Sequence, residues 1–149
     1  MKRQPADNHL QLELHVPDFI PVKDYYGKLG FRIVWERRPE ADNGYLVMEM
    51  DSTIICFWPG TDSIYDQPYF KKYPKHTPRG NGVELVIMVD DVEAYYEKVK
   101  DFANAIEPLK LQPWGSKDFR CADPFGYYLR FTEPHNILDN FNAIPEGNT

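Results

Sequence analysis

The sequence predicts an α+β fold in which two tandem βαβββ modules form a curved mixed sheet with a concave pocket. Residues 10–16 alternate strictly between apolar and polar side chains, which is typical of a half-buried strand. The order of one strand, one helix and three strands then occurs twice along the chain. The two occurrences align at a constant offset of 73 residues, which relates Val16 to Val89 and Leu29 to Phe102. Together these observations indicate an internal duplication.

The first module is expected over residues 9–58. Its first strand, from His9 to Val16, ends at Pro17 and Asp18. Pro21 is compatible with the first turn of a helix, and Gly30 ends that helix. Strands are then predicted at 31–37, 44–50 and 53–58.

The second module is expected over residues 83–133. A strand at 83–89 precedes a helix that Asp91 caps and that runs through Phe102, and strands follow at 105–111, 117–122 and 127–133. The sequence Asp123-Pro124-Phe125-Gly126 combines the residues that favour a tight turn, so it joins the last two strands as a hairpin. We expect these side chains to pack toward helices: Leu10, Leu12, Leu14, Val83, Leu85, Ile87, Leu129 and Phe131.

The remaining segments are a linker loop, 59–82, and a tail, 134–149, so residues 1–149 are expected to form a single domain. The linker contains four aromatic residues: Tyr65, Tyr69, Phe70 and Tyr73. They are expected to pack either over the edge of the core or over the mouth of a pocket.

Composition narrows the class of partner. A formal net charge of -6 disfavours nucleic acid, because phosphate binding needs clustered Lys and Arg. No apolar run approaches the ~20 residues of a membrane span, so no membrane partner is expected. The N-terminus lacks the apolar segment of a secretory signal and the chain has 2 cysteines, which predicts a cytoplasmic protein with free thiols. A neutral or cationic small molecule is the partner that fits best.

The strand residues that point away from the helices mix polar and apolar types. Gln11, Glu13, Cys56 and Trp58 belong to the first module, and Glu84, Met88, Tyr128 and Arg130 belong to the second. A solvent-exposed face would rarely carry large apolar residues at such positions, whereas a ligand pocket combines apolar walls with a few polar groups. The pattern therefore favours a pocket.

The hairpin near the C-terminus indicates a family. Pro113-Trp114-Gly115, then Phe119, then Asp123-Pro124-Phe125-Gly126 running into an apolar strand resembles the last hairpin of the bleomycin-resistance proteins. These proteins belong to the glyoxalase, or vicinal-oxygen-chelate, superfamily, and the resemblance covers residues 9–133. It implies a homodimer whose aromatic-lined crevices bind a bulky drug without a metal, with Trp114 and Phe119 among the walls.

The same resemblance bears on metal binding. In the metal-dependent relatives the ligands come from positions that correspond here to Gln11, Cys56, Glu84 and Arg130. An arginine carries a permanent positive charge and has no lone pair to donate, so we predict no metal and no cofactor. Arg130 and Glu84 are expected to pair. That pair could satisfy two buried charges, or either residue could meet a charged group of a ligand.

We therefore predict a metal-free small-molecule binding protein that sequesters a bulky, partly aromatic ligand in a dimer crevice and has no catalytic residue. The predicted ligand-binding residues are Gln11, Glu13, Cys56, Trp58, Glu84, Met88, Trp114, Phe119, Tyr128 and Arg130. Two alternatives stay open. One is a metal-dependent lyase or dioxygenase that uses Gln11, Glu84 and a rearranged third ligand, and the other is a protein whose dimer is its only function.

Overall fold

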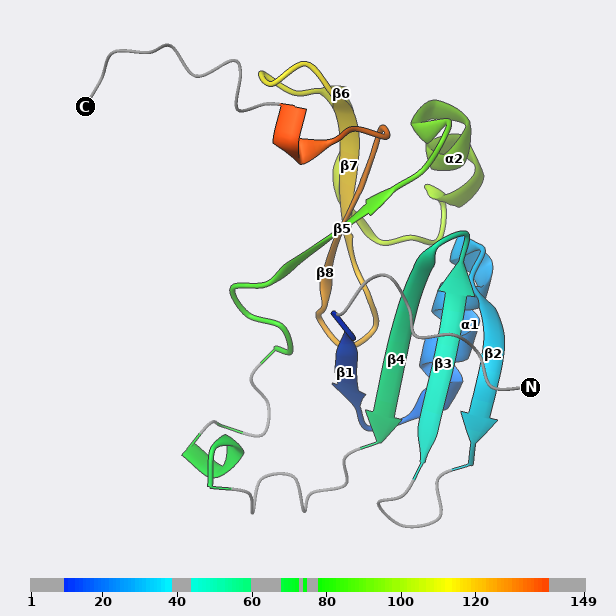
Figure 1. Ribbon diagram of the computed structural model, residues 1–149, viewed down its shortest axis with the longest axis vertical. Coiled ribbons are helices and arrows are strands. Elements are labelled where there is room, and N and C mark those ends of the chain that lie inside the picture. Colours follow the sequence, from blue (N-terminus) through cyan, green and yellow to red (C-terminus); the bar gives the residue numbers. More distant parts are fainter. Residues whose placement is uncertain (1–9, 39–43, 60–67, 73, 75–77, 140–149) are drawn as a thin grey trace.

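The computed structural model describes residues 10–38, 44–59, 68–72, 74 and 78–139 (Figure 1). The first module consists of β1 (Glu13–Val16), α1 (Phe19–Leu29), β2 (Arg32–Arg37), β3 (Tyr45–Met50) and β4 (Thr53–Pro59). A short 3-10 helix, Phe70–Lys72, precedes the second module, which consists of β5 (Glu84–Met88), α2 (Val92–Val99), β6 (Ala105–Leu111), β7 (Lys117–Ala122) and β8 (Tyr128–Thr132). The predicted βαβββ order is thus confirmed in both modules.

The strands form two four-stranded sheets with the same topology. The order is β1-β4-β3-β2 in the first sheet and β5-β8-β7-β6 in the second. β1 runs parallel to β4 and β5 parallel to β8, and the other pairs are antiparallel. In Figure 1 the second module lies above the first, with α2 to one side of its strands. Equal topology in both halves agrees with the duplication that the sequence indicates.

The helices begin at equivalent residues. The Asp18 carboxylate accepts a hydrogen bond from the Ile20 backbone N–H at 2.8 Å, and the Asp91 carboxylate accepts one from the Ala94 N–H at 3.0 Å. Both are N-caps, which satisfy backbone donors that the first helical turn leaves free. α1 ends at Gly30, whose φ of 109° is a left-handed conformation that glycine adopts without a steric penalty.

The two modules share one apolar core. Its members come from both sheets and both helices, and include Tyr26, Phe57, Phe119 and Phe131. Tyrosine hydroxyls cross between the modules. Tyr25 donates to the Ala103 carbonyl at 2.6 Å, Tyr95 donates to the Leu29 carbonyl at 2.7 Å and Tyr127 donates to the His15 carbonyl at 2.7 Å. These bonds let buried hydroxyls and carbonyls satisfy each other while they fix how the modules pack.

Two residues that were expected to face the core are exposed. Leu10 is 78% exposed and Val83 is 52% exposed. Both precede their strands, since β1 begins at Glu13 and β5 begins at Glu84. Alternation fixes the direction of a side chain only within a paired strand. The predicted strands began too early in both places, so alternation did not apply to Leu10 or Val83.

Three other expectations concern segments and boundaries. α2 ends at Val99 rather than Phe102, and the chain continues as turns through Ala103. Of the linker aromatics, Tyr65 and Tyr73 lie outside the described residues, and Tyr69 is exposed. The module boundaries 9–58 and 83–133, the linker 59–82, the tail 134–149 and the single domain remain predictions. No described helix has the length and apolarity that crossing a membrane requires.

Candidate functional site

Each sheet has one face covered by a helix and one face that points away from it. We call these uncovered faces the first open face and the second open face. The first open face carries the strand residues that alternate with buried Leu14, Leu46, Met48, Ile55 and Phe57. The second carries those that alternate with buried Ile87, Phe119, Cys121, Leu129 and Phe131. The sequence-predicted site residues divide between the two faces, except for Phe119 and for Trp114, which lies in the turn between β6 and β7.

Polar side chains on the first open face form a hydrogen-bonded cluster around Glu13. The Tyr45 hydroxyl donates to Glu13 Oε1 at 2.5 Å, and Gln11 Nε2 donates to the same oxygen at 2.8 Å. Gln11 Nε2 also lies 3.0 Å from the Tyr45 hydroxyl oxygen. Burial, followed by contacts with Cys56 and Glu13, raises the pKa of Tyr45, so this phenol stays protonated and donates. The sequence did not indicate Tyr45, because it lies in β3, which does not correspond to a ligand-bearing strand of the metal-dependent relatives.

Aromatic side chains extend this face on both sides of the cluster. Trp58 is half-buried, and its ring meets His15 edge-on with 4.7 Å between ring centroids. Trp35 is 51% exposed, with its ring 6.1 Å from that of Tyr45. Cys56 lies in β4 directly opposite Glu13 in register, and it is buried. The first open face therefore combines the Glu13 carboxylate and its hydrogen-bonded neighbours with exposed or half-buried aromatic side chains.

The second open face is organised by Arg120, in β7. Its Nε donates to Glu84 Oε1 at 2.9 Å and its Nη1 donates to Glu107 Oε2 at 2.8 Å. Asp118 Oδ1 lies 3.8 Å from the same Nη1. The hydrogen bond from Arg120 lowers the pKa of Glu107, and the bond to Glu84 raises the pKa of Arg120. One guanidinium thus balances several carboxylates.

The sequence predicted an ion pair between Glu84 and Arg130, but the nearer partner of Glu84 is Arg120. Arg130 Nε lies 3.8 Å from Glu84 Oε1, outside hydrogen-bond distance. A signal for Arg120 was present. It lies between Phe119 and Cys121 in a predicted strand, so alternation places it on the face opposite these apolar residues. In the observed register Arg120 is directly opposite Arg130.

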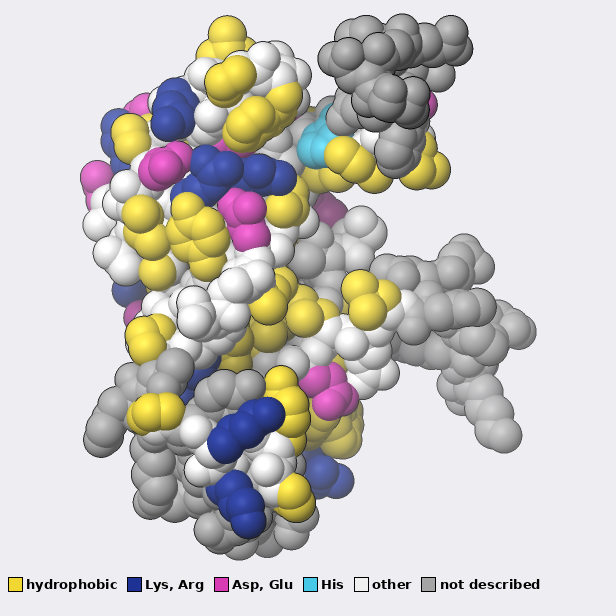
Figure 2. Space-filling view, turned by 90° about the vertical axis from the view of Figure 1, so that its left-hand side faces the viewer, with side chains coloured by type: hydrophobic (Ala, Val, Ile, Leu, Met, Phe, Trp, Pro, Cys, Tyr) yellow, Lys and Arg dark blue, Asp and Glu magenta, His cyan; other side chains and the backbone are white. Residues whose placement is uncertain are grey.

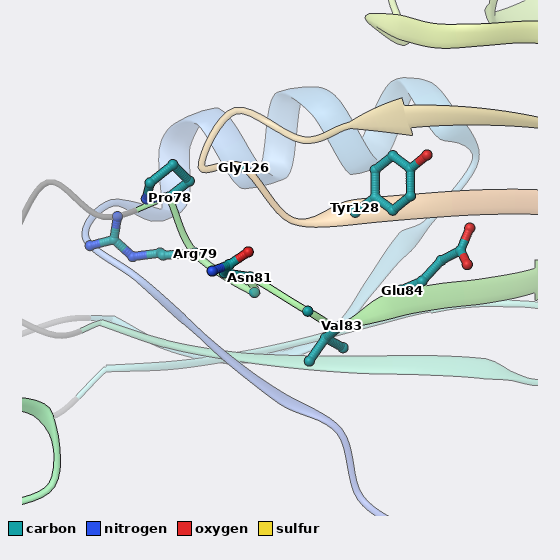
Figure 3. Close-up of a pocket in the computed structure, with 9 residues that line it drawn as sticks. Pro78, Arg79, Asn81, Val83, Glu84, Gly126 and Tyr128 are labelled. Atoms are coloured by element: carbon teal, nitrogen blue, oxygen red, sulfur yellow. The ribbon is translucent and has the colours of Figure 1, made fainter. Parts of the chain in front are cut away.

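Two hollows border this face. The larger, of about 530 Å³, lies between β5, β8 and the segment 78–83, and Glu84 and Tyr128 line it from adjacent strands (Figure 3). The smaller, of about 300 Å³, is lined by Trp114, Ser116, Arg130, Thr132, His135 and Ile137. The Arg130 guanidinium carbon lies 5.8 Å from the centre of the Trp114 ring, which is a cation–π distance.

Phe119 does not lie on either open face. It is fully buried on the helix side of β7, where its ring stacks on Phe131 at 5.2 Å and contacts Tyr96 at 5.0 Å. Its alternation with Asp118 and Arg120 sends it into the core, so its assignment as a pocket wall is corrected. Met88, in contrast, is exposed in β5, where it alternates with buried Ile87.

Figure 2 views the molecule from the left-hand side of Figure 1. In its upper half, Lys and Arg side chains lie against Asp and Glu side chains, with hydrophobic side chains on either side of them. Charged and apolar side chains thus lie next to one another on this side of the molecule.

The four positions expected from metal-dependent relatives do not fit a divalent cation. Gln11 is bonded to Glu13 and Tyr45, while Glu84 is bonded to Arg120 with Arg130 beside it. Two guanidinium groups next to the only carboxylate of the four would repel a cation. Across the described residues, no group of three or more His, Cys, Asp or Glu side chains is arranged to hold a metal ion.

The fold and the site thus define an α+β protein with two βαβββ modules and two uncovered sheet faces. The chain belongs to the Glyoxalase/Bleomycin resistance protein/Dioxygenase superfamily, whose family model matches residues 8–131. No curated protein matches the chain at the level of sequence.

Solved structures share this fold at low identity. A bleomycin resistance determinant encoded on the transposon Tn5 has a TM-score of 0.62 and 20% identity, over 87% of this chain and 99% of that one. A bleomycin-binding protein complexed with bleomycin has a TM-score of 0.59 and 19% identity, over 86% and 99%. TioX from Micromonospora sp. ML1 has a TM-score of 0.59 and 19% identity, over 87% and 98%.

Proposed function

We propose that this protein is a metal-free small-molecule binding protein of the bleomycin-resistance type, which sequesters a bulky, partly aromatic ligand. The observation that carries the proposal is the exposure of large apolar side chains on both open faces. These are Trp35, Ile54, Val86 and Met88, with Trp114 beside the second face. Such side chains provide contact area and stacking for an aromatic ligand. The structure of a bleomycin-binding protein complexed with bleomycin supports this class of function through the shared fold.

The proposal places the ligand in a crevice of a homodimer. A ligand on an open face would contact one sheet and leave its other side exposed. A second copy of the chain would be needed to enclose a bulky molecule between two faces. Glu13 is the carboxylate that we propose for a positive group of the ligand, because its partners are neutral side chains. Glu84 is less suitable than the sequence suggested, since Arg120 already neutralises it.

We further propose that the protein has no catalytic role and acts in the cytoplasm. Both cysteines, Cys56 and Cys121, are buried free thiols, as expected in a reducing compartment. The arrangement around Glu84 disfavours the alternative lyase or dioxygenase.

A fluorescence-quenching screen of glycopeptide and polyaromatic drugs tests the proposal. The exposed ring of Trp114 is expected to contact the ligand, so Trp114→Ala should weaken binding of a hit about tenfold, which corresponds to a stacking contribution of about 1.4 kcal/mol. Ile20→Ala is the control, because Ile20 is also exposed and apolar but lies on α1, away from both open faces. Equal binding by wild type and Trp114→Ala would remove Trp114 from the site, and a screen without hits would favour a protein whose dimer is its only function.

Elemental analysis of protein purified without a chelator separates binding from metal chemistry. We expect no stoichiometric Ni, Zn, Fe or Mn. A near-stoichiometric metal that disappears in Glu84→Gln would contradict the proposal in favour of the metal-dependent lyase or dioxygenase.

A further inference from the structure

Arg130 is a partly buried cation whose Nε makes no hydrogen bond with the residues that the structure describes. Its side chain is 21% exposed, and its Nε is buried with no hydrogen-bond partner. Within the described part of the chain, its contacts are the distant carboxylate of Glu84 and the ring of Trp114. A guanidinium has five N–H donors, and leaving them unpaired inside a protein is costly. Arg130 therefore has donor capacity that the protein itself does not use.

The hollow beside Arg130 contains no carboxylate. Trp114, Ser116, Thr132, His135 and Ile137 are its other lining residues, and none of them is acidic. Glu84 lines the other hollow, and it is shared between Arg120 at 2.9 Å and Arg130 at 3.8 Å. The charge of Arg130 is thus only partly balanced, and none of the described residues that line the smaller hollow carries an opposing charge. An anion is the kind of group that this position favours.

The other lining residues indicate what carries the anion. The Trp114 ring, 58% exposed, offers a flat surface next to the guanidinium. Ser116 and Thr132 are hydroxyl-bearing residues of the same lining, and Ile137 adds an apolar wall. His135 Nδ1 lies 3.0 Å from the Glu133 carbonyl oxygen, so this nitrogen donates to the backbone and leaves Nε2 available. A volume of about 300 Å³ suits a one- or two-ring group.

We propose that the hollow between Trp114 and Arg130 is a binding subsite for an aromatic carboxylate, whose ring stacks on Trp114 and whose carboxylate pairs with the Arg130 guanidinium. The planar fork of an arginine matches the two oxygens of a carboxylate, which gives the subsite a preference for planar anions. The inference deepens the proposed function, on which it rests, because it adds a negative group to the expected ligand. The protein as a whole is acidic and would repel an anion, so the preference for an anion comes from Arg130 and its immediate surroundings.

Three probes with the same ring system test the subsite: 2-naphthoate, the neutral 2-naphthamide and the cationic 2-(aminomethyl)naphthalene. Isothermal titration calorimetry of the wild-type chain should give a Kd for naphthoate at least tenfold lower than that for the amide, with the amine weakest. The preference should shrink as salt is raised, because the ion pair is partly exposed. This comparison needs no variant, so it does not depend on whether a substitution folds.

Variants then assign the preference to Arg130. Arg130→Gln should weaken naphthoate at least tenfold and make it equal to the amide, while Arg130→Lys should keep part of the preference. Arg32→Gln is the matched control, because Arg32 is an exposed arginine in an ion pair with Glu49 on the first sheet. Trp114→Ala should weaken all three probes. Thermal unfolding of each variant checks that it is folded.

The outcomes separate this inference from the proposed function. Equal affinity for acid and amide, no binding of any probe, or a preference that persists in Arg130→Gln would overturn the subsite. A bulky polyaromatic hit that depends on Trp114, together with equal binding of acid and amide, would retain the proposed function and remove the subsite. An Arg130-dependent preference for naphthoate without any bulky hit would support the subsite and reject a bulky ligand.

Discussion

Arg120 is the side chain that holds the second open face together. It is largely buried and bonds two carboxylates from different strands: Glu107 in the adjacent β6, and Glu84 in β5 on the far side of β8. Asp118 is buried nearby and keeps a bond from Gln112 Nε2 at 2.7 Å. Removing one member of such a cluster leaves the remaining charges close together without a counter-ion.

Arg120→Met should therefore lower the free energy of unfolding by about 2 kcal/mol, somewhat less than for a fully buried pair, because Glu84 and Glu107 are partly exposed. Urea denaturation followed by circular dichroism measures it. Arg32→Met is the matched control, since the exposed Arg32–Glu49 pair should contribute within about 0.5 kcal/mol. Equal losses in both variants would contradict the structural role of Arg120.

Burial of the Cys121 thiol makes the stability of the folded protein depend on pH. Burial raises the pKa of its thiol to about 11, against a smaller lowering effect of the Tyr25 hydroxyl. Between the unfolded and the folded pKa, the folded state binds more protons, so stability falls as pH rises through this window. We expect wild type to lose about 2 kcal/mol more than Cys121→Ala between pH 9 and pH 11. Parallel stability curves in urea titrations would contradict this.

The hairpin between β7 and β8 is the element that the sequence predicted most completely. Asp123 Oδ1 accepts from the backbone N–H of Phe125 at 2.8 Å and of Tyr127 at 2.9 Å, and Oδ2 accepts from the Tyr26 hydroxyl at 2.9 Å. Gly126 has a φ of 94°, which a residue with a side chain rarely adopts. The turn thus reverses the chain and also ties the second module to α1.

Asp123→Ala should lower the free energy of unfolding by about 3 kcal/mol, because several buried donors lose their acceptor. Asp123→Asn keeps one carbonyl oxygen and should cost less. Asp91→Ala is a control for loss of a simple helix cap, with an expected cost of about 1 kcal/mol. Chemical denaturation of the three variants measures these costs, and an order in which Asp91→Ala is the most destabilising would reject the bridging role of Asp123.

Element order was predictable from local signals, whereas side-chain partners were not. The caps Asp18 and Asp91 and the turn at 123–126 act within a few residues, so their effects are visible in sequence. The ends of β1 and β5 depend on pairing with strands far along the chain, and this is why Leu10 and Val83 were misplaced. The position of Phe119 followed from alternation in its own strand, but the family resemblance was given more weight.

The candidate site was only partly predictable, because its geometry arises from contacts across strands. Arg120 and Arg130 lie directly opposite each other in register, yet only Arg120 bonds Glu84. Whether Arg120 or Arg130 bonds Glu84 depends on side-chain rotamers. It also depends on Glu107 in β6, which accepts a second hydrogen bond from Arg120. The bond between Tyr45 and Glu13 likewise joins residues 32 positions apart, so no local pattern indicates it.

At the scale of the whole molecule, both sheets present apolar side chains on faces that no described helix covers. An apolar surface of this extent on a protein in water favours association. A homodimer that brings two open faces together would bury these side chains and create the crevice of the proposed function. A stable interface of this kind buries about 1,200–2,000 Å² in total.

Sedimentation equilibrium should therefore give a mass of about twice the 17.5 kDa of the chain. Trp35→Glu places a charge on the first open face and should raise the dimer dissociation constant at least tenfold, because the carboxylate would lose its hydration on association. Ile20→Glu is the matched control, since Ile20 is also apolar and exposed but lies on α1. A wild-type monomer, or an equal effect of both substitutions, would show that the open faces do not mediate association and that a ligand binds to one chain alone.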